Sequence, residues 1–80
     1  MSDKPAHPGT ITFVDANAGT ENVRAAGDVP ETIAYCRVGE HWVPVTRVVA
    51  LVVGNKRDIK KYAADGTLLE TTAQFRKPPR

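Results

Sequence analysis

Apolar and polar residues alternate in short stretches along the middle of the chain. The first stretch, Thr10 to Val14, alternates Ile11 and Phe13 with threonines, which is the two-residue period of a half-buried strand. Turn-forming residues separate the stretches near 15–20, 27–31, 39–40, 54–57 and 65–66. This regular spacing predicts a series of short antiparallel strands. The second strand, Asn22 to Ala26, is brief and poorly apolar, so we expect it at a sheet edge.

The segment that follows is compatible with a short helix near residues 29–37. In this interpretation Asp28 is the N-cap, and Glu31 completes a capping box because it lies three residues further on. Pro30 would occupy the first turn, where its missing N–H costs nothing, and Gly39 would end the helix.

The same segment is also compatible with a strand, Ile33 to Val38, paired with the residues from His41 onward across a Gly39–Glu40 turn. That register places Cys36 opposite Val43 and collects the apolar residues on one face. Arg37 then lies opposite Trp42, and Tyr35 opposite Pro44. The consistent sorting favours the hairpin over the helix.

His41 to Val53 is the most apolar stretch and predicts the most buried strand of the domain. Pro44 lacks an amide donor, so the strand must bulge, bend or leave one edge unpaired there. At 13 residues, a strand over this range is long enough to curl around a small barrel.

The clearest hairpin signal is Asp65–Gly66, which joins the strands Arg57 to Ala64 and Thr67 to Phe75. Counting outward from this turn pairs Tyr62 with Leu69, Lys61 with Glu70 and Ile59 with Thr72. The second pair brings opposite charges directly across the ladder, which stabilises it.

Together these elements predict a mainly β fold, a small antiparallel curled sheet or partly open barrel of five to six strands with at most one short helix near 29–37. The alternative is an α+β fold with that helix packed on a four-stranded sheet. We expect a single domain over residues 9–75, a flexible tail at 1–8 and a basic, proline-rich tail at 76–80.

Composition limits what such a domain can do. A chain of 80 residues buries roughly 60% of its unfolded surface, which excludes a multidomain enzyme or a nucleotide-binding α/β domain. Its one cysteine excludes an intrachain disulfide framework. The longest apolar run, Val48 to Val53, is far shorter than the roughly 20 residues that cross a bilayer. We therefore expect a cytoplasmic protein with no membrane partner and no cofactor. The sequence leaves the oligomeric state open, with a monomer as the default.

Asn55–Lys56–Arg57–Asp58 after a buried apolar strand resembles the guanine-specificity element of Ras-like GTPases. The resemblance implies that Asp58 reads the base edge, Asn55 braces the loop and the Lys56 stem lies along the base. A glycine-rich phosphate loop ending in Lys-Ser or Lys-Thr, which this family also needs, is not in the sequence. The interpretation favoured here is a polar turn leaving a valine-rich strand.

Cys36 and His41 lie diagonally across the predicted hairpin, where a thiol and an imidazole can interact. No third, orienting group accompanies them, so the pair is interpreted as a buried hydrophobe and a strand-end residue. With His7 they supply too few ligands for a metal, and no metal site is expected.

Charge divides the chain into two unequal parts. Residues 1–53 have a net charge of −2, and residues 54–80 have a net charge of +4. Lys56, Lys60 and Lys61 are expected to form a basic ridge, extended by the C-terminal tail. The candidate binding residues are this ridge, an exposed face on the first hairpin and the tail: Lys56, Arg57, Lys60, Lys61, Tyr35, Arg37, Trp42, Arg76, Lys77 and Arg80.

These residues predict a non-catalytic protein-binding or adaptor module, with another protein as the preferred partner. The alternative is a β-barrel module that binds single-stranded nucleic acid through the basic ridge at 56–61 and the C-terminal tail, with Tyr35, Trp42, Tyr62 and Phe75 as stacking platforms. A minimal thiol enzyme that uses Cys36 and His41 is a distant third.

Overall fold

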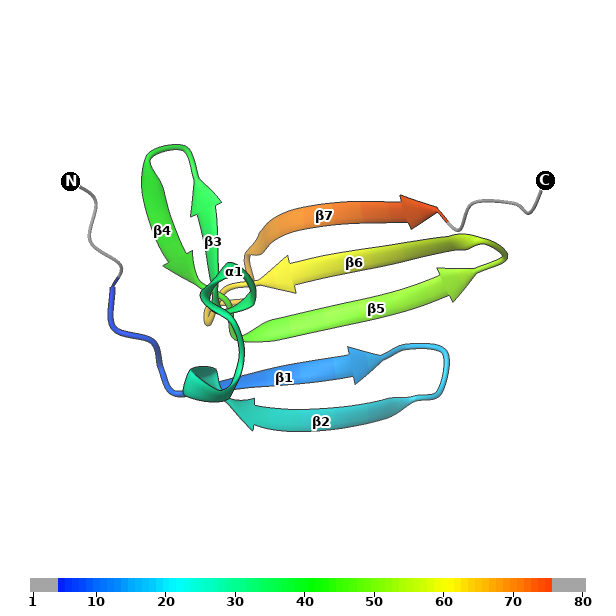
Figure 1. Cartoon of the computed structure of the whole chain (residues 1–80), viewed down its shortest axis with the longest axis horizontal. Helices are drawn as coiled ribbons and strands as arrows, with labels where there is room; N and C mark the ends of the chain where they lie inside the picture. Colours follow the sequence, from blue (N-terminus) through cyan, green and yellow to red (C-terminus); the bar gives the residue numbers. More distant parts are fainter. Residues whose placement is uncertain (1–4, 76–80) are drawn as a thin grey trace.

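The computed structural model of the chain describes residues 5–75, which form seven strands, a 3₁₀ turn and a short helix (Figure 1). In chain order these are β1 (Thr10–Asp15), β2 (Thr20–Ala25), η1 (Ala26–Asp28), α1 (Glu31–Ala34), β3 (Tyr35–Val38), β4 (His41–Pro44), β5 (Arg47–Val53), β6 (Lys56–Tyr62) and β7 (Leu68–Phe75). The mainly β class predicted from the alternation is confirmed.

Five strands form one open sheet in the order β2-β1-β5-β6-β7, and β3 and β4 form a separate hairpin. Three of the four ladders in the large sheet are antiparallel, as predicted. The fourth ladder, between β1 and β5, is parallel. The β3–β4 hairpin returns the chain to the end of the sheet where β1 begins, so β5 starts at the same end as β1 (Figure 1). The sheet does not close into a barrel, and β2 is an edge strand as expected.

The segment predicted as one strand from His41 to Val53 is divided between the two sheets. β4 ends at Pro44, and β5 begins only at Arg47. Between them, the Val45 amide donates to the Ala34 carbonyl at 2.9 Å, across the small hairpin, and the next amide donates to β6. The prediction of a continuous strand is therefore wrong, because the chain bends after the proline and turns Val45 fully into the core.

Both interpretations of the segment from 28 to 37 hold, each for a different part. Glu31–Ala34 forms one helical turn, and the strand of the hairpin begins at Tyr35. The hairpin register is the predicted one, with Cys36 opposite Val43. The predicted capping box is wrong, because the N-cap is Pro30, which makes no side-chain cap, and Asp28 belongs to η1.

The β6–β7 hairpin follows the predicted register except beside its turn. Lys61 lies opposite Glu70, and Ile59 opposite Thr72. Tyr62 lies opposite Leu68 instead of Leu69, because a bulge adds one residue to β7 at this point.

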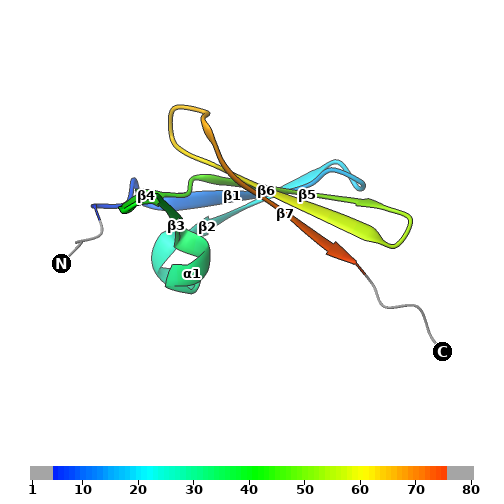
Figure 2. The ribbon, with the colours of Figure 1, turned by 90° about the horizontal axis from the view of Figure 1, so that it is seen from above.

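The core is small and lies at one end of the large sheet. Its buried residues are Ile11 and Val48 of the sheet, Ala34 and Cys36 of the α1–β3 segment, and Val45 between the two sheets. Figure 2 shows α1 on one side of the sheet only, near this end. The strands continue well past the core, and on the far half of the sheet no other element of residues 5–75 packs on either face (Figure 2).

Candidate functional site

The uncovered half of the sheet contains an open hollow of about 900 Å³ on the side that carries α1. Its floor is formed by alternate residues of the three central strands, namely Phe13, Val48, Ala50, Val52 and Ile59. Ile33 of α1 lines its end nearest the core. Alternation in the strands therefore places an apolar floor where no segment of residues 5–75 packs, which is the arrangement of a ligand or partner surface.

Polar side chains line the two long sides of the hollow. Asn22 lines it from β2, and Arg57, Thr72 and Gln74 line it from β6 and β7. Arg57 is exposed and has no ion-pair partner within residues 5–75. The hollow thus has an apolar floor with a free guanidinium on one side, which suits a carboxylate beside an apolar group.

The β1–β2 turn is held against the hollow by Asn17. Its side-chain amide donates to the Val52 carbonyl at 2.8 Å, and its carbonyl oxygen accepts the Val52 amide. Asp15 fixes the same turn by accepting the amides of Asn17 and Ala18, both at 3.1 Å. Asn17 therefore extends the pairing of β5 past the end of β1 and gives this rim of the hollow a defined position.

The predicted basic ridge is divided between the two faces of the sheet. Arg57 and Lys61 alternate onto the face of the hollow, whereas Lys60 lies on the opposite face. Lys56, at the start of β6, also borders the hollow. Lys56 forms an ion pair with Asp58 at 3.6 Å. Lys60 is exposed, with no ion pair among residues 5–75. The structure does not bring the four cations together.

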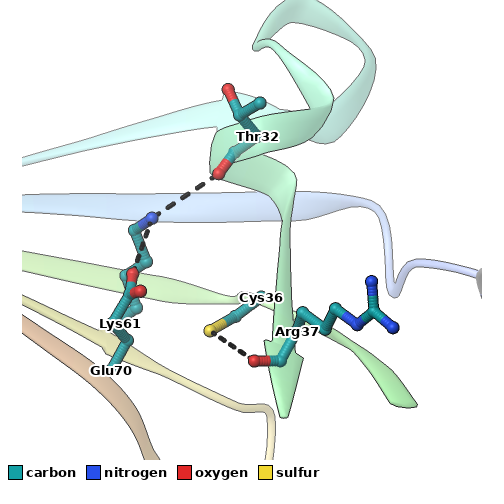
Figure 3. A network of polar contacts seen from close by, with 5 residues as sticks. All are labelled: Thr32, Cys36, Arg37, Lys61 and Glu70. Carbon is teal, nitrogen blue, oxygen red and sulfur yellow. Dashed lines mark hydrogen bonds and ion pairs between the residues drawn. The ribbon is translucent and has the colours of Figure 1, made fainter. Parts of the chain in front are cut away.

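Lys61 serves to attach α1 to the sheet (Figure 3). Its ammonium group forms an ion pair with Glu70 at 3.1 Å and donates to the Thr32 carbonyl at 3.5 Å. Only 18% of its side chain is exposed. Lys61 is therefore committed to contacts inside the protein, unlike Arg57 on the same face.

Tyr35, Arg37 and Trp42 all lie on the β3–β4 hairpin, away from the hollow. The Arg37 guanidinium carbon lies 5.8 Å from the centre of the Trp42 ring, which confirms the cross-strand pair. Tyr35 donates its hydroxyl to the Pro5 carbonyl at 2.9 Å and packs edge-on against His7. These contacts of Tyr35 hold residues 5–9 against the hairpin. The aromatic side chains of the hairpin therefore do not continue the basic surface of β6.

His7 has both ring nitrogens engaged, although the sequence placed it in a flexible tail. An amide can only donate and a carbonyl can only accept, so the contacts assign both roles. Nδ1 accepts the Gly9 amide at 3.0 Å, and Nε2 donates to the Val45 carbonyl at 2.7 Å. Residues 7–9 are thereby attached to the turn between the two sheets.

The segment that resembles a guanine-specificity element forms an antiparallel turn between β5 and β6. Asn55 lines the hollow, whereas Asp58 is paired with Lys56 and does not line it. The two residues that the resemblance implies for base recognition are therefore not directed into one site.

Cys36 and His41 occupy the predicted diagonal positions, but their surroundings differ. Cys36 is buried and His41 is exposed. Burial, followed by the nearby Glu70 carboxylate, raises the pKa of the Cys36 thiol. A raised pKa favours the thiol over the nucleophilic thiolate. Among residues 5–75, no group of three or more His, Cys, Asp or Glu side chains is arranged to hold a metal ion.

The remaining predicted binding residues, Arg76, Lys77 and Arg80, lie outside the described residues. The hollow itself was not predicted, because its lining comes from all five strands of the large sheet and from α1. The local signal for it is the alternation of Val48, Ala50 and Val52, within the stretch that the sequence indicated as the most buried strand.

Comparisons with known proteins identify no relative: no family model, curated protein or solved structure matches the chain. Within residues 5–75, no helix is long and apolar enough to cross a membrane.

Proposed function

We propose that the protein is a non-catalytic protein-binding module and that the hollow is its binding surface. The observation that carries the proposal is the apolar floor of the hollow, which the fold builds on a well-paired sheet and leaves uncovered. An exposed Val52 contributes little to the stability of the isolated chain. A partner that covers it contributes a favourable free energy of binding of about 25 cal/mol per Å² of apolar surface buried.

The lining supports a partner segment of defined chemistry. The floor suits apolar side chains spaced along a helix, because a sheet commonly buries its face against a helix. Arg57 has no ion-pair partner among residues 5–75 and suits a carboxylate on that segment. We therefore expect an amphipathic helix with an acidic residue at one side of its apolar stripe.

Two neighbouring residues of β5 provide a matched test. Val52 and Leu51 are 45% and 39% exposed, and they point to opposite faces of the same strand. The full chain, immobilised, should capture a discrete protein from lysate. Val52→Glu should abolish this capture, and Leu51→Glu should leave it unchanged, while circular dichroism shows both variants folded. Equal loss in the two variants, or capture that survives Val52→Glu, would overturn the proposal.

The second candidate, binding of single-stranded nucleic acid, has less support from the geometry. The cations of β6 lie on both faces, and Lys56 and Lys61 are paired with carboxylates. Tyr35 and Trp42 lie on the separate hairpin. If nucleic acid were nevertheless the ligand, oligonucleotide affinity would fall between about 50 and 200 mM salt, with a log–log slope of about −0.7 per phosphate contact.

The third candidate, a thiol enzyme, requires a reactive Cys36. The thiol is buried and its pKa is raised, so iodoacetamide should label it more slowly than free cysteine at neutral pH. Rapid labelling would favour the enzyme. The unpaired thiol also supports a reducing compartment, such as the cytoplasm, as the place where the module works.

A further inference from the structure

The outer edge of β7 is the least protected edge of the large sheet. Natural sheets protect their edges with charged side chains, prolines or very short strands. β7 is eight residues long, contains no proline and carries one charged residue, Glu70. The other edge strand, β2, is shorter and carries both Glu21 and Arg24. The sequence predicted β2 as an edge strand, and the structure shows that β7 is the longer and less charged of the two edges.

The two ends of β7 also expose apolar side chains. Leu68 at its start and Phe75 at its end are 48% and 67% exposed. Two copies of β7 that pair antiparallel place the start of one strand beside the end of the other. Such pairing brings each apolar end against the opposite end of its partner, so the edge is complementary to itself.

We propose that two copies of the chain associate through β7, forming a continuous ten-stranded sheet about a two-fold axis at Thr72. A two-fold axis normal to the sheet keeps the same faces of the two copies on the same side. In an antiparallel pair, such an axis lies midway between one residue and the same residue of the second copy, so that residue lies opposite itself. With Thr72 on the axis, Glu70 lies opposite Gln74 of the second copy, and Leu69 lies opposite Phe75.

Other two-fold registers satisfy fewer of these contacts. An axis at Glu70 places two carboxylates opposite each other, which is destabilising. An axis at Thr71 leaves Phe75 beyond the paired residues of β7, and an axis at Ala73 shortens the paired segment. The register at Thr72 pairs residues 69–75, places the polar Glu70 opposite Gln74 and the apolar Leu69 opposite Phe75, and keeps both hollows on one face of the joined sheet.

Sedimentation of the full chain tests the association directly. The wild-type protein should shift from monomer to dimer between micromolar and near-millimolar concentration. Thr72→Lys places two lysines opposite each other at the axis, and should weaken the dimer by about fivefold or more, from about 1 kcal/mol of repulsion. The matched variant Thr71→Lys places its lysine opposite Ala73 and should have a smaller effect. A protein that stays monomeric throughout this range would overturn the proposal.

Cysteine crosslinking tests the register. Thr72→Cys should form a covalent dimer under mild oxidation, because only the axial residue lies opposite itself. The wild-type chain is the control, since its one thiol, Cys36, is buried. Thr71→Cys should crosslink poorly, and Val23→Cys on β2 should not crosslink beyond the control. Preferred crosslinking at Thr71 would overturn the register, and preferred crosslinking at Val23 would overturn the choice of edge.

Discussion

Lys60 and Lys61 are adjacent in β6 and have opposite surroundings. Lys60 is exposed on the face away from α1, whereas Lys61 lies beneath α1 and contacts both Glu70 and the Thr32 carbonyl. The two residues look alike in a count of charges. Strand alternation, which places neighbours on opposite faces, makes one of them a surface cation and the other a structural one.

Replacing each lysine by methionine separates these roles. Lys61→Met removes the contacts that attach α1 to the sheet, and should lower the free energy of unfolding by about 1–2 kcal/mol. Lys60→Met should change it by less than about 0.5 kcal/mol. Urea denaturation of the two variants is the measurement. A similar loss in both would mean that the Thr32 and Glu70 contacts contribute nothing to stability.

At the scale of elements, the turn between β6 and β7 depends on Asp65. Its carboxylate accepts the Thr67 amide at 3.0 Å, and the Ala63 amide donates to the Thr67 carbonyl. Hydrogen bonding to Thr67 lowers the pKa of Asp65. The folded state therefore favours the charged carboxylate, and protonation weakens the turn.

The sign of this effect gives a pH prediction. The contribution of Asp65 to stability is complete above the unfolded pKa of about 3.9 and is lost as the pH falls through the lower folded value. The Thr67 amide signal should follow that titration in NMR spectra. In Asp65→Asn the acid-dependent shift of this amide should disappear, because the side chain no longer titrates. A shift that persists in the variant would assign the titration to another group.

Local pairing explains which elements could be predicted from the sequence. The β3–β4 and β6–β7 hairpins have registers fixed by nearby turns, so counting from Gly39 or Gly66 located most of their partners. The proline indicated a bulge, a bend or an unpaired edge at Pro44, but the direction of the bend depends on Val45 packing in the core. The parallel pairing of β1 with β5 depends on the whole segment between them. Neither feature is determined by a short segment of the sequence. The hollow was missed for the same reason, because Phe13 and Ile59 come together only in the folded sheet.

At the scale of the whole molecule, the protein has a core at one end and a single layer at the other (Figure 2). Ile11 and Val48 are buried where α1 covers the sheet. Val52 and Val53, further along β5, are 45% and 62% exposed. Stability should therefore decrease along the strands, away from the core.

Native-state hydrogen exchange at low protein concentration should show this gradient. The slowest amides of the sheet should be those of β1 and β5 near Ile11 and Val48, opening with the global free energy of unfolding. The amides of β2 and of the β5–β6 turn at Gly54 should open at much lower free energy. Uniform protection along β5 would show that the uncovered half is as stable as the covered half.

The parallel ladder between β1 and β5 has a consequence for the order in which the protein folds. Its first pair, Thr12 with Arg47, joins residues 35 positions apart, and closing a loop of that length costs about 3 kcal/mol of chain entropy. During synthesis the β1–β2 hairpin must wait until β5 has left the ribosome before it gains its neighbour. Because doubling a loop adds only about 0.6 kcal/mol, the turn at Gly39 within this connection should tolerate an inserted peptide. A reporter sequence placed there would leave the hollow and both sheet edges unaltered.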